Sequence, residues 1–340
     1  MPINPSNMRV VDVARLLNST SFGFVLPQAR LYREFNRVGF RIGSSENPHN
    51  INLLKYIAWM FDRKHTPEET SGARSYEERR NAERDRQAEQ SLAGRDIGPL
   101  PEVVNPDRKA ACERNFQLFC ESYFPETYSL AWSPDHLKVI EKIETAVLRG
   151  GLFALAMPRG SGKSTLSESA VIWAMLYGHR EFITLIGATE SAALETLDSI
   201  KTELEVNERL AEDFPEVCYP VAQLEGIANR CNGQLYKGER TRITWTSNEI
   251  VLPTVEGSRA SGIIVRVAGI TGRIRGMKFK RSDGRSVRPS LVVIDDPQTS
   301  ESAGSLEQTR KRVRVLAGDI LGLAGPGQKI SGIMPCTIIR

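Results

Sequence analysis

The pattern of apolar and polar positions alternates between strand-like and helix-like segments over much of the chain. Residues 152–157 form a continuous apolar run, which is typical of a strand buried on both faces. Residues 164–177 carry apolar side chains at helical spacing. A strand near residue 182 and a long helix capped near Thr189 follow, and a further apolar strand covers residues 291–294. This alternation predicts an α/β domain with a mostly parallel, doubly wound sheet.

The first 65 residues have a different pattern, in which short amphipathic helices predominate. Residues 10–20 and 26–40 fit two such helices, and the second is expected to stop at Gly39. Residues 40–51 suit a wing-like hairpin, and residues 52–65 suit a closing helix. The arrangement predicts a small winged helix-turn-helix domain over residues 1–65.

The second of these helices carries the expected DNA contacts. Its spacing places Ala29, Tyr32 and Phe35 on the inner face. The outward residues are expected to touch bases and phosphates: Gln28, Arg30, Arg33 and Arg37. The alternative is a small helical domain that docks on protein only.

Residues 66–110 are expected to form a linker. The first part is dense in alternating charge and has almost no apolar face, and the second part contains three prolines. We therefore expect a solvated helix followed by an extended tether, and a separate domain over residues 111–340.

Charge changes this picture locally. The chain of 340 residues has a net charge of only +4, yet residues 1–65 hold nine Lys or Arg against four Asp or Glu. Residues 237–288 hold twelve against four. Both segments suit a polyanionic partner, although either is also compatible with a solvated basic face.

Composition excludes several classes of protein. The five cysteines form no C-x-x-C pair and the four histidines are scattered, which argues against a zinc site or a disulfide framework. Apolar stretches are interrupted by charge before they reach membrane-spanning length, and the first residues lack a cleavable signal. We expect an intracellular protein without membrane contact.

The strand at 152–157 and the following helix enclose a glycine-rich turn. Its expected nucleotide-binding residues are Pro158, Arg159, Gly160, Ser161, Gly162, Lys163, Ser164 and Thr165. A loop that joins a buried strand to a helix start presents free amides and the helix dipole to phosphates. Lys163 is expected to reach the β- and γ-phosphates and Ser164 to ligate Mg²⁺. Met157 stands where the usual motif has its first glycine.

Two carboxylates follow the apolar strand at 291–294. Asp295 stands where a Walker B residue holds magnesium, and Asp296 is placed to orient and deprotonate the attacking water. A simple turn cap after the strand is the alternative. With the phosphate loop upstream, the pair predicts ATP hydrolysis with Mg²⁺ as cofactor.

In combination, these motifs resemble the large terminase subunit of tailed phages. The resemblance covers residues 111–340 and rests on the altered glycine loop, TGRIRGMKF, LVVIDDP and KISGIMPCTI. It implies a RecA-like P-loop ATPase that pumps double-stranded viral DNA through a portal protein into the procapsid as a ring of subunits. Met157 departs from the general motif but not from this family. Residues 1–65 resemble the winged helix-turn-helix of lambda-type small terminase subunits.

The resemblance implies roles for further residues. Arg159 matches the mid-loop arginine near the phosphates, and Arg275 matches an arginine finger that serves a neighbouring subunit. The segment after Arg275 is unusually long, so Arg281, Arg285 and Arg288 are competing candidates. GIMPCT matches the motif that couples hydrolysis to motion, although Met334 stands where a hydroxyl residue is common.

The resemblance also implies a setting. The chain would act in the host cytoplasm at the portal, as a ring or as a monomer in isolation. A nuclease is expected on a separate chain or beyond Arg340, and a small terminase subunit is a possible partner. Two alternatives stay open: a superfamily 2-type DNA helicase, and a non-enzymatic DNA-recognition adaptor with a nucleotide-binding fold.

Overall fold

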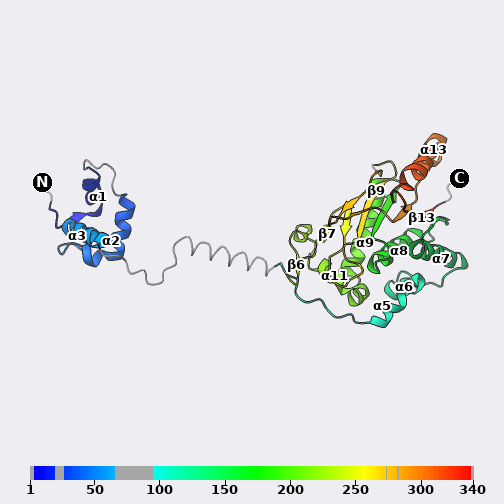
Figure 1. Cartoon of the computed structure of the whole chain (residues 1–340), viewed down its shortest axis with the longest axis horizontal. Helices are drawn as coiled ribbons and strands as arrows, with labels where there is room; N and C mark the ends of the chain where they lie inside the picture. Colours follow the sequence, from blue (N-terminus) through cyan, green and yellow to red (C-terminus); the bar gives the residue numbers. More distant parts are fainter. Residues whose placement is uncertain (1–3, 20–26, 66–94, 273, 282, 338–340) are drawn as a thin grey trace. The chain divides into compact units, whose positions relative to one another are not determined.

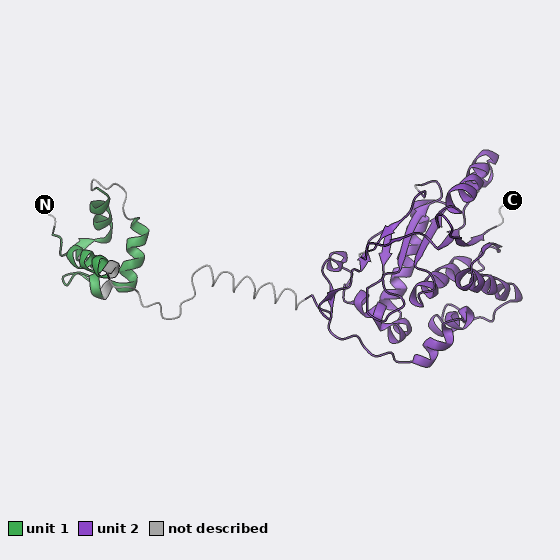
Figure 2. Cartoon of the chain, viewed as in Figure 1, with its two compact units in different colours: residues 1–84 green, residues 85–340 purple. Residues whose placement is uncertain are grey.

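The chain divides into two compact units, residues 1–84 and 85–340 (Figure 2). A computed structural model describes residues 4–19, 27–65, 95–272, 274–281 and 283–337. The charged first part of the expected linker, residues 66–94, lies outside the described residues.

The first unit is a small helical domain with one short pair of strands. Its elements are β1 (Met8–Arg9), α1 (Val10–Asn18), α2 (Gln28–Ile42), β2 (Asn50–Ile51) and α3 (Leu53–His65). β1 pairs antiparallel with β2. The core between these elements includes the fully buried side chains of Val13, Leu31, Ile42, Ile51 and Tyr56.

The inner face of α2 differs from the expectation. Leu31 is fully buried, whereas Ala29 is exposed and Tyr32 is 45% exposed. Only Phe35 of the expected inner set packs against the core. Leu31 and Ile42 bury more apolar surface than Ala29, and this larger gain decides how the helix is rotated.

The expected stop at Gly39 lies beside a break in α2: Val38 has a non-helical φ of −131° and ψ of 23°, and a second helical segment follows to Ile42. Over 40–51 the chain turns back on itself through an antiparallel bridge between Gly43 and Ile51, and the amide of Ser44 donates to the carbonyl of Asn50 at 2.8 Å. The returning strand β2 pairs on its other side with β1, at the start of the unit.

The second unit is built on a seven-stranded sheet (Figure 1). Its strands, in spatial order, are β3 (Leu152–Ala156), β13 (Ser331–Cys336), β12 (Leu291–Asp295), β4 (Phe182–Gly187), β9 (Ile264–Gly269), β8 (Glu249–Val251) and β7 (Thr244–Trp245). The first five are parallel, and β8 and β7 continue antiparallel. The expected α/β organisation with a mostly parallel sheet is confirmed.

Helices connect and cover these strands. They are α5 (Pro106–Cys112), α6 (Phe116–Tyr123), α7 (Pro134–Leu148), α8 (Lys163–Leu176), α9 (Glu190–Val206), α10 (Glu208–Asp213), α11 (Pro215–Ala222), α12 (Ser300–Ala303) and α13 (Leu306–Arg314). A π-helical turn, η2 (Val315–Ile320), extends α13, and a 3₁₀ turn, η1 (Ala228–Cys231), follows α11. Short strand pairs are β5 (Leu235–Tyr236) with β6 (Glu239–Arg240), and β10 (Phe279–Lys280) with β11 (Ser286–Val287).

The central helix α8 is buried almost all round. It packs against β12, β13, α6 and α9, and Trp173 at its centre is fully buried. Such a helix presents its N-terminus at a fixed place, since packing on every side prevents it from sliding. The neighbouring α9 begins as expected at Thr189, whose hydroxyl accepts a hydrogen bond from the amide of Ala192 at 3.2 Å.

Strand β3 is an edge strand, not the doubly buried strand expected from its apolar run. It pairs with β13 on one side, and no described strand pairs with its other side. Leu152 is consequently 54% exposed. The apolar run does not reveal this, because the place of a strand within a sheet is set by long-range pairing.

Residues 95–110, which the sequence assigns to the linker, belong to the second unit and pack against the rest of it. The amide of Ile97 donates to the carbonyl of Leu235 at 2.9 Å. Arg108 donates to the fully buried carboxylate of Asp213 at 2.6 Å, and the hydroxyl of Tyr123 donates to the same carboxylate at 2.7 Å. Pro106 therefore starts helix α5, and the stretch is attached to the unit in place of the expected tether. No helix among the described residues is long and apolar enough to cross a bilayer.

Candidate active site

The parallel sheet brings the glycine loop, residues 157–162, to the same edge as the two carboxylates. β3 ends directly before the loop, and β12 ends at Asp295. β13 lies between them, with Cys336 paired to Ala156. Because carboxyl ends of parallel strands share one edge, the two segments meet there, and Nζ of Lys163 lies 3.3 Å from Oδ2 of Asp296.

The loop has the backbone of an anion cradle. Gly160 and Gly162 have φ of 78° and 72°, in the left-handed region that other residues adopt at a cost. Gly162 caps α8 without a side-chain hydrogen bond. A Cβ at either glycine would meet nothing within 4 Å, so the surface over the loop is open. The free amides at this helix start can bind phosphate oxygens.

Met157 shows why the first glycine is dispensable here. Its φ is not positive, its side chain is only 7% exposed, and its amide donates to the carbonyl of Cys336 at 3.0 Å. The position is thus an extension of the strand that anchors its side chain in the core, and it needs none of the freedom of glycine.

His136 supports the loop from the start of α7. Its Nε2 lies 3.0 Å from the carbonyl oxygen of Ser161, and its Nδ1 lies 2.9 Å from the hydroxyl of Ser133. A pocket of about 400 Å³ opens beside these residues and is lined by side chains of α7, β3 and the loop. The structure therefore gives this histidine a positioning contact and no reactive partner.

The loop places two cations differently. Lys163 is only 8% exposed, and its one ion pair is the contact with Asp296. Arg159 is exposed and makes no hydrogen bond or ion pair with any described residue. Lys163 is therefore held in the site, whereas Arg159 is free to reach a bound anion.

Asp295 has the features of a ligand to a hard cation. Burial raises the pKa of its carboxyl group and the charge of Asp296 raises it further, whereas the nearby hydroxyl of Ser164 lowers it. Its Oδ1 is buried and has no hydrogen-bond partner among the described atoms. An orphaned carboxylate oxygen beside a hydroxyl fits Mg²⁺, which prefers oxygen ligands.

The protein alone would not complete such a site. Across the described part of the chain, no three His, Cys, Asp or Glu side chains are grouped so that they could hold a metal ion. The nearby carboxyl of Glu168 has its pKa raised by burial, and Ser199 donates to it at 2.7 Å. Magnesium that is bound through one or two protein ligands takes the rest from water and substrate phosphates.

Asp296 is held in a strained and specific position. Its φ is 37°, its amide donates to the carbonyl of Pro335 at 3.2 Å, and its carboxylate accepts the amide of Thr337 at 2.7 Å. The Thr337 hydroxyl lies 3.3 Å from Oδ2. A non-glycine residue in this region persists only where its surroundings over-determine it, as they do at functional sites. Sequence reasoning missed Thr337, since it looked for the hydroxyl at Met334, three residues earlier in GIMPCT.

Arg275 lies outside this cluster of contacts. Its side chain is 81% exposed and its Nε lies 2.5 Å from Oδ1 of Asp319, a residue of η2. Of the competing arginines, Arg281 donates to the carbonyl of Gly262, and Arg285 pairs with Asp283. The β10–β11 hairpin accounts for the unusually long segment that carries them.

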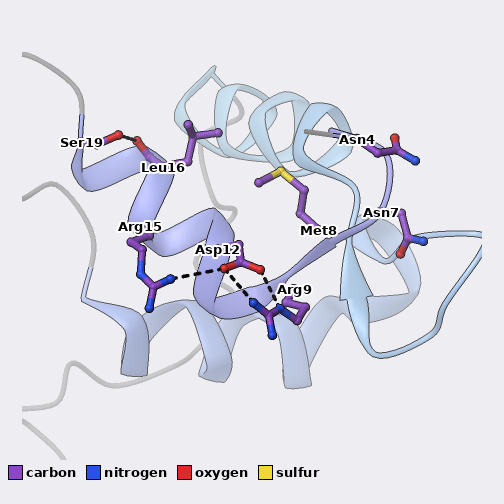
Figure 3. A pocket seen from close by; sticks show the side chains of 8 residues that line it. All are labelled: Asn4, Asn7, Met8, Arg9, Asp12, Arg15, Leu16 and Ser19. Carbon is purple, nitrogen blue, oxygen red and sulfur yellow. Dashed lines mark hydrogen bonds and ion pairs between the residues drawn. The ribbon is translucent and has the colours of Figure 1, made fainter. Parts of the chain in front are cut away.

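The expected DNA contacts lie on the exposed side of α2. Gln28, Arg30, Arg33 and Arg37 are all exposed. Arg30 pairs with Glu34 at 3.2 Å. Arg9 of β1 and Arg15 of α1 instead turn toward Asp12, at 2.7 and 3.7 Å, along a pocket of about 560 Å³ (Figure 3).

No model of a protein family matches the chain, and no curated protein is significantly similar to it.

Proposed function

We propose that the chain is a magnesium-dependent ATPase that drives translocation of double-stranded DNA, in the manner of a viral genome-packaging motor. The observation that carries the proposal is the meeting of Lys163 with Asp296 beside an orphaned oxygen of Asp295. A charge as buried as that of Lys163 is costly and suits a site that awaits a charged ligand.

Each residue has a distinct task in the proposed reaction. The loop amides and Lys163 bind the β- and γ-phosphates, and Arg159 adds charge from the exposed side. Ser164 and Asp295 would hold magnesium, which neutralises charge on the phosphates when bound. Asp296 orients the attacking water and accepts its proton.

The contact between Lys163 and Asp296 suggests how the site is kept ready. Phosphate oxygens compete with Asp296 for the lysine, so nucleotide binding releases the carboxylate to face water. Thr337 then keeps Asp296 oriented through its amide and hydroxyl. The strained backbone of Asp296 fits such a pre-set base.

The wider setting of the motor rests on the resemblance to terminases. Duplex viral DNA, a portal and a procapsid are the proposed partners, the host cytoplasm is the proposed location, and the first unit is proposed to recognise DNA through α2. Arg275 is proposed to serve the nucleotide of a neighbouring subunit in a ring, and its 81% exposure supports reach beyond its own chain.

Release of phosphate from ATP by the full chain tests the proposal. Turnover is expected to need Mg²⁺ and to rise with duplex DNA, and Lys163→Ala is expected to lower it about 100-fold or more. Lys280→Ala removes an exposed lysine of the same unit and serves as the control. If the chain is instead a non-enzymatic adaptor, no variant will release phosphate, and if it is a helicase, it will separate the strands of a duplex. Equal turnover in Lys163→Ala and wild type would refute the assignment of the active site.

A further inference from the structure

Helix α13 presents an exposed basic face that the proposed reaction does not use. Arg310, Lys311 and Arg314 are exposed, and none of them forms an ion pair within the described chain. Their spacing places them on one face of the helix, and the first and last lie about 6 Å apart along its axis. Figure 1 shows α13 standing out from the sheet at one end of the second unit.

Little acidic charge opposes this face. Residues 305–329 contain five Lys or Arg and two Asp or Glu. One of the two acids, Asp319, is already paired with Arg275. The other, Glu307, is exposed and makes no ion pair with any described residue. Such a face complements a dense row of phosphates, because a duplex carries one charge per about 1.7 Å of its axis.

The opposite side of α13 is tied to the candidate active site. Arg312 donates from Nε to the carbonyl of Pro297 at 2.9 Å, and Pro297 directly follows Asp296. Gln298 donates to the hydroxyl of Thr309 at 3.1 Å, and that hydroxyl lies 3.3 Å from the carbonyl of Ser302. A shift of the loop after Asp296 would therefore be passed to the helix.

The continuation of α13 fits a part that adjusts its position. η2 has π-helical turns, which are rare and occur often at functional sites. Beside it, an apolar pocket of about 320 Å³ is lined by Leu316 and Ala317 of η2 and by side chains of β3, β12 and β13. Space beside the helix leaves room for a small displacement, which close packing would prevent.

We propose that Arg310, Lys311 and Arg314 bind the phosphate backbone of duplex DNA, and that the contacts of Arg312 and Thr309 couple this binding to Asp296. The inference rests on the proposed function, since coupling has meaning only if Asp296 acts in ATP hydrolysis. It adds the surface that would grip the substrate and the route by which hydrolysis would reach it.

The binding part is tested by the salt dependence of duplex affinity, measured with the full chain. Log affinity falls with log salt, and each lost phosphate contact reduces the magnitude of this negative slope by about 0.9. Arg310→Gln/Lys311→Gln/Arg314→Gln is therefore expected to reduce the magnitude by about 2.7. The control Arg114→Gln/Arg149→Gln/Arg209→Gln removes the same charge from exposed positions of the unit that lie outside the basic segment 237–288. Equal slopes for the two triple variants, or a wild-type slope in the α13 variant, would contradict DNA binding by this face of α13.

The coupling part is tested with Thr309→Val, which changes no charge. The ratio of ATP turnover with duplex DNA to turnover without it is expected to fall toward one, while the salt slope stays at the wild-type value. An unchanged ratio would contradict the coupling.

Two variants distinguish failure of this inference from failure of the proposed function. If Lys163→Ala keeps wild-type turnover while the α13 triple variant still has a weaker salt dependence, the proposed ATPase is wrong and the DNA-binding surface is supported. If Lys163→Ala abolishes turnover while the α13 triple variant keeps the wild-type salt dependence, the ATPase is supported and the surface is wrong.

Discussion

Helix α2 of the first unit and the candidate active site of the second unit place their charged residues in opposite ways. In the first unit, the arginines of α2 point into solvent, and the ion pair of Arg30 with Glu34 is exposed on the arginine side. In the second unit, Lys163 is buried, and burial raises the pKa of both Asp295 and Glu168. Exposed charge costs little and tells only the sign of a partner's charge. Buried, strained charge is costly, so it identifies a particular chemistry.

The largest expected effect on ATP turnover concerns Arg275. This residue is exposed in its own chain, and it is proposed to complete the buried active site of a neighbouring subunit. Turnover per chain should rise with protein concentration, and Arg275→Ala should remove this rise, a loss of about 10³-fold or more for an arginine finger. Mixing Arg275→Ala with Asp296→Asn should restore part of the activity. If dilute chains hydrolyse ATP as fast as concentrated ones and Arg275→Ala does not change turnover, Arg275 has no role in hydrolysis beyond its ion pair with Asp319.

The next effect concerns Asp296, the most constrained carboxylate of the site. Asp296→Asn should lower hydrolysis about 10²- to 10⁴-fold, because an amide cannot accept the proton of water. Nucleotide binding should be kept or tightened, since Lys163 loses its competing partner. Thr337→Val, which removes only the hydroxyl contact, should cost about tenfold. Phosphate release and ATP affinity, measured side by side for each variant, test this prediction. If Asp296→Asn loses phosphate release and ATP affinity to the same extent, Asp296 is not the general base.

Asp295 should show a conflict between stability and function. Because burial raises its pKa, the fold favours the protonated form, and this stabilisation is lost as pH rises above roughly 4 through the raised pKa. Without nucleotide at neutral pH, Asp295→Asn should therefore melt at a higher temperature than wild type. With Mg-ATP at 100 times its Kd, wild type should gain about 2.7 kcal/mol and the variant less. Melting curves across pH that are unaffected by the substitution would contradict the burial argument.

The smallest effect belongs to the exposed arginines of the first unit. Arg30→Gln/Arg33→Gln/Arg37→Gln should lower the salt slope of duplex binding by about 2.7, and should change the unfolding free energy by less than about 1 kcal/mol, as expected for exposed charges. Arg9→Gln/Arg15→Gln/Lys55→Gln is the matched control, since two of its arginines already face Asp12. Equal slopes for both variants would leave the first unit as a protein-docking domain.

The elements of the second unit were predictable because their signals are local. A continuous apolar run, a capping threonine at Thr189 and apolar helical spacing each act within a few residues, and the strand before Asp295 and the helix after the glycine loop were both confirmed. The meeting of Lys163 with Asp296 was not predicted, but one further rule explains it: parallel strands end at the same edge of a sheet.

What the sequence did not reveal depends on distant partners. Thr337 reaches Asp296 from 41 positions away, and Arg108 reaches Asp213 from 105 positions away. The exposure of β3 depends on β13 pairing between β3 and β12. The rotation of α2 toward Leu31 depends on which side chains fill the small core of the first unit. Local patterns carry no information on such choices, because each is a competition between tertiary contacts.

The most direct test of the central claim is the thermal stability of the full chain as Mg-ATP is titrated. The buried charges around Lys163 and Asp295 are held to await this ligand, so the melting temperature of wild type should rise steadily with Mg-ATP, by the amount that mass action requires. It should rise less with ATP in the presence of a chelator, and hardly at all in Lys163→Ala. An equal rise in Lys163→Ala and wild type, or no rise in either, would contradict the account.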